Sequence, residues 1–181
     1  MSKSLHATRL NMQALAQEGQ PLIEITPLQD LQRLAQEAQG LALDASVSWQ
    51  AKAELRPGSG AEPDVWLHLQ ADISIPLTCQ RCMGVVATPL QVDQWYRFVA
   101  TEDIAMEQDD ESEEDLLVMA PQFDLLAVLE DELLMALPLV PMHDECPVAP
   151  VLQAGEDELA DDTSEKPNPF AALAQLKKKN P

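Results

Sequence analysis

The most constraining feature of this chain is a strict alternation of apolar and mostly polar residues in two neighbouring segments. The first segment runs from Leu41 to Leu55 and the second from Val65 to Leu77. Because successive side chains of a strand point to opposite faces of a sheet, the pattern predicts two long strands, each with one buried face. The connecting string PGSGAEP is rich in turn residues. We therefore expect an antiparallel hairpin.

A third run, from Val85 to Val99, is apolar but less regular. It predicts another strand, and Pro89 within it indicates a sheet edge or a bulge, because proline cannot donate to a strand ladder. The run from Leu116 to Met119 is short enough to be a further strand. The three longer segments together predict a β meander with one polar face.

Two segments have the spacing of amphipathic helices. The string LQDLQRLAQEAQ places leucines on one face; we expect Thr26 as its N-cap, Pro27 at its first position and Gly40 as its stop. The second helix is expected from Asp124 to Leu137, because its leucines recur every three or four residues and Pro138 ends the run. The predicted fold class is therefore α+β: an antiparallel β meander packed with two or three helices.

Composition along the chain predicts one folded domain with tails. We expect an N-terminal segment over 1–20, a single α+β domain over 21–147, an acidic linker over 148–166, and a short basic helical tail over 167–181. Within the domain, residues 101–115 carry nine acids between positions 102 and 115. Such a segment is expected to be a flexible, disordered loop, since it cannot bury itself.

Charge divides the sequence sharply. Residues 98–165 contain no Lys or Arg but 21 of the 31 Asp and Glu residues. This stretch should repel phosphate backbones and attract cationic surfaces. The acidic loop could serve solubility alone, or it could attract a basic partner. The triplet Glu130, Asp131 and Glu132, expected on the exposed face of the second helix, is a candidate partner-binding site.

The sequence predicts a soluble, cytoplasmic protein that has no membrane partner. The string MSKSLHATRLN lacks the apolar run of a signal peptide, and acids interrupt the apolar region from Leu116 to Met142. Three cysteines are a poor basis for a disulfide framework. These features favour a reducing compartment.

Two short strings have the spacing of metal-ligand pairs. Cys79 and Cys82 lie in TCQRCMG between two predicted strands, and His143 and Cys146 lie in HDEC with the same gap. Four such ligands could form a Cys3His zinc site. Alternatively, Cys79 could be a small buried apolar residue and Cys82 a turn residue. A redox dithiol fits less well, because such motifs usually open a helix.

The string KPNPFAALAQLKKKNP has the marks of a short helix with a basic end. Asn168 can cap it, Pro169 suits its first turn, and three lysines suit its last turn. A helix this short is marginal alone, so it would dock on this protein or on a partner. The candidate partner-binding residues here are Pro167, Asn168, Pro169, Phe170, Lys177, Lys178 and Lys179.

Three strings together resemble one protein family. TCQRCMG, DLLAVLEDELLMALPLVPMHDEC and KPNPFAALAQLK are similar to the YceD family, the large ribosomal RNA subunit accumulation proteins of bacteria, over roughly Thr78 to Lys178. The resemblance implies a role in the synthesis, processing or stability of large-subunit ribosomal RNA, and it implies no catalytic residues. The Cys and His positions also match, although the second pair varies in spacing among members, so zinc is a candidate cofactor.

These observations favour a non-enzymatic factor in ribosome biogenesis that works through a basic ribosomal or RNA-processing protein. Contact with ribosomal RNA is expected to be indirect, because the chain's one cluster of cations is Lys177 to Lys179, with Lys166 nearby. One alternative is an acidic adaptor or nucleic-acid mimic. Another is a CxxC thiol or zinc enzyme, for which the sequence offers no phosphate loop, GxSxG or HExxH motif.

Overall fold

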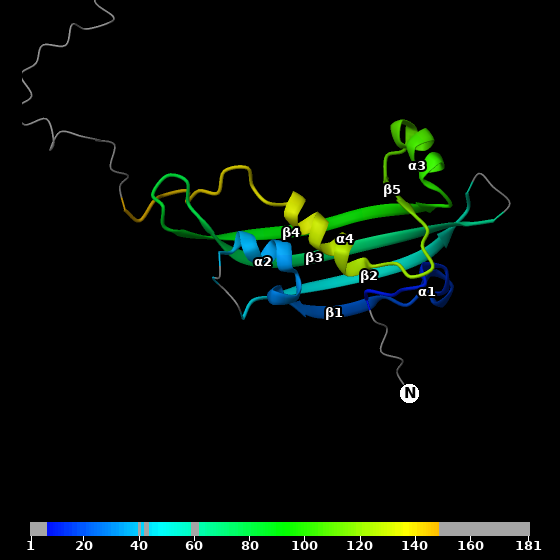
Figure 1. Cartoon of the computed structure of the whole chain (residues 1–181), viewed down its shortest axis with the longest axis horizontal. Coiled ribbons are helices and arrows are strands. Elements are labelled where there is room, and N and C mark those ends of the chain that lie inside the picture. Colours follow the sequence, from blue (N-terminus) through cyan, green and yellow to red (C-terminus); the bar gives the residue numbers. More distant parts are fainter. Residues whose placement is uncertain (1–6, 40, 42–43, 59–61, 149–181) are drawn as a thin grey trace, which may run out of the picture. The chain divides into compact units, whose positions relative to one another are not determined.

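A five-stranded sheet forms the frame of the protein in the computed structural model, which describes residues 7–39, 41, 44–58 and 62–148. The strands lie in chain order, and neighbours are antiparallel except for the last pair, which is parallel (Figure 1). They are β1 (Leu22–Pro27), β2 (Ser46–Arg56), β3 (Asp64–Thr78), β4 (Val85–Val99) and β5 (Asp115–Val118). The α+β class and the central meander are thus confirmed.

The β3–β4 hairpin is the longest part of the sheet. Its register runs without a bulge from Thr78 opposite Val85 to Trp66 opposite Arg97. On its other side β4 pairs with β5 only over Tyr96–Val99. Pro89 therefore lies on an edge portion of β4, where a strand tolerates proline because the missing N–H is not needed for the ladder.

The helices are α1 (Met12–Glu18), α2 (Gln32–Glu37), α3 (Glu102–Gln108) and α4 (Leu125–Met135), with short 3-10 turns at Leu28–Asp30 and Asp109–Glu111. Helices α1, α2 and α4 contribute buried residues to the core, whereas α3 buries none and lies beside β5. In Figure 1, α4 runs over the sheet with α2 beside it. The carboxylate of Asp124 caps α4 by accepting from the N–H of Ala127 at 3.1 Å. The second predicted helix is confirmed to within two residues at its end.

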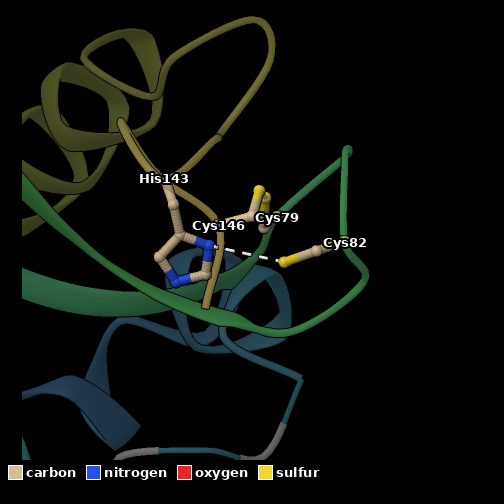
Figure 2. A group of neighbouring side chains, drawn as sticks. All are labelled: Cys79, Cys82, His143 and Cys146. Carbon is tan, nitrogen blue, oxygen red and sulfur yellow. Dashed lines mark hydrogen bonds between the residues drawn. The ribbon is translucent and has the colours of Figure 1, made fainter. Parts of the chain in front are cut away.

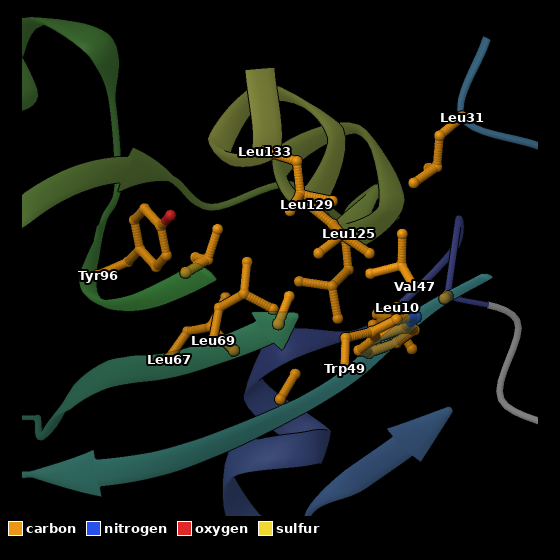
Figure 3. Packing of buried hydrophobic residues seen from close by; sticks show 14 of the residues in the cluster. Leu10, Leu31, Val47, Trp49, Leu67, Leu69, Tyr96, Leu125, Leu129 and Leu133 are labelled. Atoms are coloured by element: carbon orange, nitrogen blue, oxygen red, sulfur yellow. The ribbon is translucent and has the colours of Figure 1, made fainter. Parts of the chain in front are cut away.

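The core lies between α4 and the inner face of the sheet. Leu125, Leu129 and Leu133 are fully buried and point from α4 toward Leu67 and Leu69 of β3 (Figure 3). Their spacing of four residues keeps them on one side of the helix. The alternation in β2 and β3 supplies the other half of the core. Burial of so many aliphatic side chains is what fixes α4 across the strands.

The opposite face of the sheet carries a cluster of aromatic and charged side chains. The guanidinium of Arg56 lies 4.5 Å from the ring centre of Trp66 and 4.0 Å from that of Trp95. The ring of His68 stacks on Trp95 at 4.2 Å, and Asp93 binds its Nε2 at 2.6 Å. His68 is partly shielded from solvent by these neighbours.

The first predicted helix is shorter than expected and begins later. Thr26 is not its N-cap: it lies in β1, opposite Val47 of β2. Its buried hydroxyl accepts a hydrogen bond from Trp49 Nε1 at 2.8 Å, so that side chain is engaged in the sheet. Pairing with β2 therefore outcompetes helix capping. Strand β2 also begins at Ser46, not at Leu41.

Two segments that we predicted from the sequence to lie outside the folded core are part of the fold. Within 1–20, α1 buries Met12 and Leu15 in the core, and Leu10 pairs with Phe123. Residues 101–115, expected to be disordered, form α3 and a 3-10 turn before β5. The hydroxyl of Thr101 caps α3 by accepting from the N–H of Ile104 at 3.4 Å. Local caps and contacts to β4 order a segment whose composition alone indicates disorder.

The predictions for the linker from 149 onward and for the basic tail, including Pro167, Phe170 and Lys177 to Lys179, lie outside the described residues. In the part of the chain that is described, none of the helices is long and apolar enough to cross a membrane.

Candidate metal centre

The β3–β4 connection forms a tight knuckle around Cys79 and Cys82. The N–H of Cys79 donates to the carbonyl of Gly84 at 2.8 Å, and the carbonyl of Cys79 accepts from the N–H of Met83 at 2.9 Å. Met83 takes a left-handed conformation with φ of 58°. These bonds turn the chain within a few residues and direct both thiols to the same side, as the CxxC spacing predicts.

The second pair of residues arrives on the loop that follows α4. The N–H of Gln80 donates to the carbonyl of Pro141 at 2.9 Å, which ties this loop across the end of the hairpin. His143 and Cys146 are thereby brought over the knuckle (Figure 2). The ligand atoms of these residues, Cys79 and Cys82 all lie within 4.8 Å of one another.

The separations of the ligand atoms suit a metal ion. Cys79 Sγ and Cys146 Sγ are 3.9 Å apart, and Cys82 Sγ and His143 Nδ1 are 3.5 Å apart. Two thiolates bound tetrahedrally to zinc at about 2.3 Å lie roughly 3.8 Å from each other. The 3.9 Å gap is also far too long for a disulfide, whose sulfurs are about 2.05 Å apart, and all three cysteines are free.

The imidazole of His143 is oriented by a main-chain group. Its Nε2 lies 3.0 Å from the carbonyl oxygen of Val85, the first residue of β4. A carbonyl can only accept, so Nε2 carries the hydrogen and donates it. In the neutral imidazole Nδ1 is then the nitrogen without a hydrogen, and it faces the sulfur of Cys82. This is the arrangement by which proteins orient a metal-binding histidine.

The environment of Cys79 favours its thiolate. Burial by itself raises the pKa of Cys79, but the main-chain N–H groups of Cys82, His143 and Arg81 and the side chain of His143 outweigh it and lower the pKa to about 5. By contrast, burial and the neighbouring sulfurs of Cys82 and Cys79 raise the pKa of Cys146. The knuckle thus favours one negatively charged sulfur, whereas a second one would require a neighbouring cation.

All four side chains named from the sequence therefore converge. Cys79 is fully buried and the other three are partly buried. Three thiols and one imidazole provide the donors that zinc prefers, and four protein ligands make a closed, structural type of site. The sequence did not reveal the roles of Val85 and Pro141, because those residues contribute main-chain oxygens that any residue type could supply.

The acidic triplet on α4 is only partly exposed, contrary to expectation. Glu130 is buried, with 9% of its surface exposed. Its carboxylate accepts from the main-chain N–H groups of Arg33 and Leu34 at 2.7 and 3.2 Å, at the start of α2, and from Arg33 Nε at 2.9 Å. Asp131 is exposed and binds the same guanidinium. Glu130 is engaged because unpaired N–H groups at a helix start attract a carboxylate.

Fold and site together define a class: a small α+β protein in which a Cys3His cluster gathers residues from the β3–β4 hairpin and from the loop after α4. Comparison with known proteins gives the family. The family described as large ribosomal RNA subunit accumulation protein YceD matches residues 67–177. A protein of that name from Haemophilus influenzae is 33% identical over 151 residues, covering 82% of this chain and 83% of the relative. This chain belongs to the YceD family. No solved structure matches it.

Proposed function

We propose that this protein acts in the accumulation of large-subunit ribosomal RNA as a non-enzymatic factor in ribosome biogenesis. The observation that carries the proposal is the family match, which includes the β3–β4 hairpin, α4 and all four residues of the Cys3His cluster. The relative that is similar over most of both chains is named for the same process. The proposed contribution is to the synthesis, processing or stability of the RNA.

We propose that the Cys3His cluster holds a structural zinc ion. When bound, zinc would neutralise the thiolates and join the two loops that carry them. The unprotonated Nδ1 of His143 and the lowered pKa of Cys79 support this assignment. A closed set of four protein ligands leaves no position for a substrate, which favours a structural over a catalytic role.

The proposed partner is a basic ribosomal or RNA-processing protein, with ribosomal RNA contacted indirectly. Most cations of the described chain are engaged internally: Lys52 and Arg56 pair with Glu54, Arg33 with Glu130, and Arg97 with Glu114. Only Arg9 and Arg81 are left outside the ion pairs found in the described residues. Such a surface offers little to phosphate and much to a basic protein.

Deletion and complementation test the proposed process. In a strain that lacks the protein, the level of large-subunit ribosomal RNA, normalised to small-subunit RNA, should fall and should recover with the wild-type chain. Affinity purification should recover large-subunit precursors or their proteins. Unchanged RNA levels together with recovery of neither would contradict the proposal.

Direct binding measurements test the proposal that the protein contacts a basic protein and reaches RNA only indirectly. The purified chain should bind large-subunit RNA only weakly at physiological salt, since binding of this kind depends on clustered cations. Replacement of Lys177, Lys178 and Lys179 by Ala should remove most of what binding remains. Tight RNA binding that survives this replacement would show that the protein contacts RNA itself.

A further inference from the structure

Most of one side of β4 has no strand beside it in the described part of the chain. β5 pairs with Tyr96–Val99 and stops there, so Val85–Trp95 remains an open edge. The carbonyl of Val99 accepts from Met119 at 2.8 Å, and that of Val85 faces His143, both on the side away from β3. Alternate residues of a strand turn their main-chain groups to the same side.

The direction of the unpaired groups follows from this parity. Because the β3–β4 register is continuous, residues 87, 89, 91, 93 and 95 turn their main-chain groups to the same side as Val85 and Val99. Pro89 is the one position among them with no N–H. Ala87, Gln91 and Asp93 therefore present N–H and carbonyl groups ready to pair with an added strand.

Two hollows lie in line along this open edge. One, of about 750 Å³, is formed by Val86–Pro89 and by residues 138–144 of the loop that leads to the metal centre. The other, of about 260 Å³, is formed by Gln91–Gln94 and by Glu132, Met135 and Ala136 at the end of α4. The edge is thus a trough with β4 on one side and α4 with its loop on the other.

The walls of the trough are apolar and acidic. Met135, Val140 and Met142 expose 70%, 53% and 47% of their surface, which is much for such side chains in a monomer. Unbranched methionines adapt to different partners. The charged residues that line the two hollows are Asp93, Glu132 and Asp144, against a single cation, Arg81. The occupant should therefore combine apolar side chains with basic ones.

We propose that the open edge of β4 binds an extended, basic segment of a partner protein by strand addition, in line with β5. Main-chain bonds to Ala87, Gln91 and Asp93 would hold the segment, and its apolar side chains would contact Met135 and Met142. This inference rests on the proposed basic partner and specifies how that partner is bound.

A matched pair of variants tests the role of the backbone. Gln91→Pro removes the outward N–H while leaving the ladder with β3 intact, and Gln91→Ala removes the exposed side chain but keeps that N–H. The probe is a fluorescein-labelled peptide of alternating Lys and Val, titrated into the full-length chain. Gln91→Pro should weaken its binding about five- to tenfold, the effect of losing one main-chain hydrogen bond, and Gln91→Ala less than about twofold.

Further probes separate strand addition from charge attraction. The same peptide with N-methyl groups on alternate valines cannot pair as a strand and should bind no better to wild type than to Gln91→Pro. Glu132→Gln, a second variant that leaves the strands untouched, should weaken the unmodified peptide. Equal affinities for wild type and Gln91→Pro, with circular dichroism showing both folded, would overturn the proposal. So would a dimer of this chain that Gln91→Pro dissociates.

Complementation distinguishes this inference from the proposed function. Failure of Gln91→Pro to restore large-subunit RNA, where Gln91→Ala does restore it, supports strand addition as the way the factor works. If both variants restore the RNA, the edge proposal fails while the proposed function stands. If the wild-type chain itself has no effect on the RNA, the proposed function fails, and the peptide titration still decides the edge.

Discussion

The two ends of β4 are held in different ways. Its start lies beside the three thiols and the imidazole of the Cys3His cluster, whereas its end carries Arg97, whose guanidinium binds the acidic segment 101–115. Arg97 donates to Glu114, Gln108 and Ser112 at 2.5, 3.0 and 2.9 Å. At both ends of β4, a loop that buries little apolar surface is attached to the sheet. At the start of the strand, the attachment depends on cysteine and histidine side chains from distant segments. At its end, it depends on hydrogen bonds within one segment.

The difference between the two ends is one of cooperativity. A metal site works only when all its ligands are in place, so the loop from 138 to 146 should be attached fully or not at all. The three acceptors of Arg97 can be lost one at a time. One substitution at the start of β4 should therefore detach the whole loop from 138 to 146. One substitution at its end should only weaken the attachment of the segment 101–115.

The largest effect is expected from Cys79→Ser. This change should reduce bound zinc from about one ion per chain to almost none and lower the melting temperature by about 10 °C or more, because metal binding contributes directly to folding. Metal content is measured by mass spectrometry on the protein purified with zinc. His68→Ala is the matched control, since His68 lies outside the cluster. Full zinc content in Cys79→Ser would show that zinc binds without Cys79, which would contradict the proposed metal site.

Glu130→Ala provides a reference between the two ends. The buried carboxylate of Glu130 pairs with the guanidinium of Arg33, as that of Glu114 pairs with Arg97, but the Glu130 pair joins the helices α4 and α2. We expect the free energy of unfolding to fall by about 2–4 kcal/mol, because two N–H groups of α2 lose their acceptor. Asp131→Ala, which breaks the exposed half of the same contact, should cost less than about 1 kcal/mol. Urea denaturation measures both values.

Arg97→Gln should loosen the far end of β4 without unfolding the rest. The local cost is expected to be about 1–3 kcal/mol, since the pair with Glu114 is largely shielded from solvent. Hydrogen exchange should become faster in α3 and β5 and remain unchanged at the knuckle around Cys79 and Cys82. Lys52→Gln, at an exposed pair, is the control and should change neither region. Uniform acceleration throughout the sheet would show that the two ends are not independent.

Acid should release the two ends in different ranges of pH. In the metal-free protein the pKa of Cys79 is lowered from 9.0 to about 5, so its contribution is present above pH 9 and is lost as the pH falls toward 5. Burial raises the pKa of Glu114, but the hydrogen bonds from Arg97 and from the main chain, together with nearby positive charge, outweigh it and lower the pKa from 4.5. This contribution is therefore lost only as the pH falls below 4.5. Thermal unfolding of wild type, Cys79→Ser and Arg97→Gln across pH 3–9 tests the order.

Much of the frame could be predicted because it rests on simple periodicity. The strands β3 and β4 and the helix α4 follow from alternation or from leucine spacing, and proline marks the edge of β4. The four cluster residues could be named from two short spacings. Their meeting could not be derived, since it depends on the main-chain bond between Gln80 and Pro141, which no residue type encodes.

The errors share a cause, which is competition from distant segments. Thr26 has the sequence of a helix cap, yet pairing with β2 and a bond from Trp49 keep it in a strand. Glu130 lies in a run of three acids that is typical of a solvent-exposed helix face, yet its carboxylate accepts hydrogen bonds at the start of α2. The segment 101–115 has the composition of a disordered loop, yet hydrogen bonds to Arg97 hold it in place. In each case the deciding partner is too far away in sequence for local patterns to identify.

The parallel pairing of β5 with β4 has a practical consequence. No tight turn sets the register of a parallel pair, and the chain between Val99 and Asp115 has room to vary in length. Doubling the length of such a connection costs only about 0.6 kcal/mol in closure entropy. The exposed turn at Asp109–Glu111 is thus a suitable position to insert a fluorescent protein or an affinity tag, leaving the Cys3His cluster and the open edge of β4 untouched.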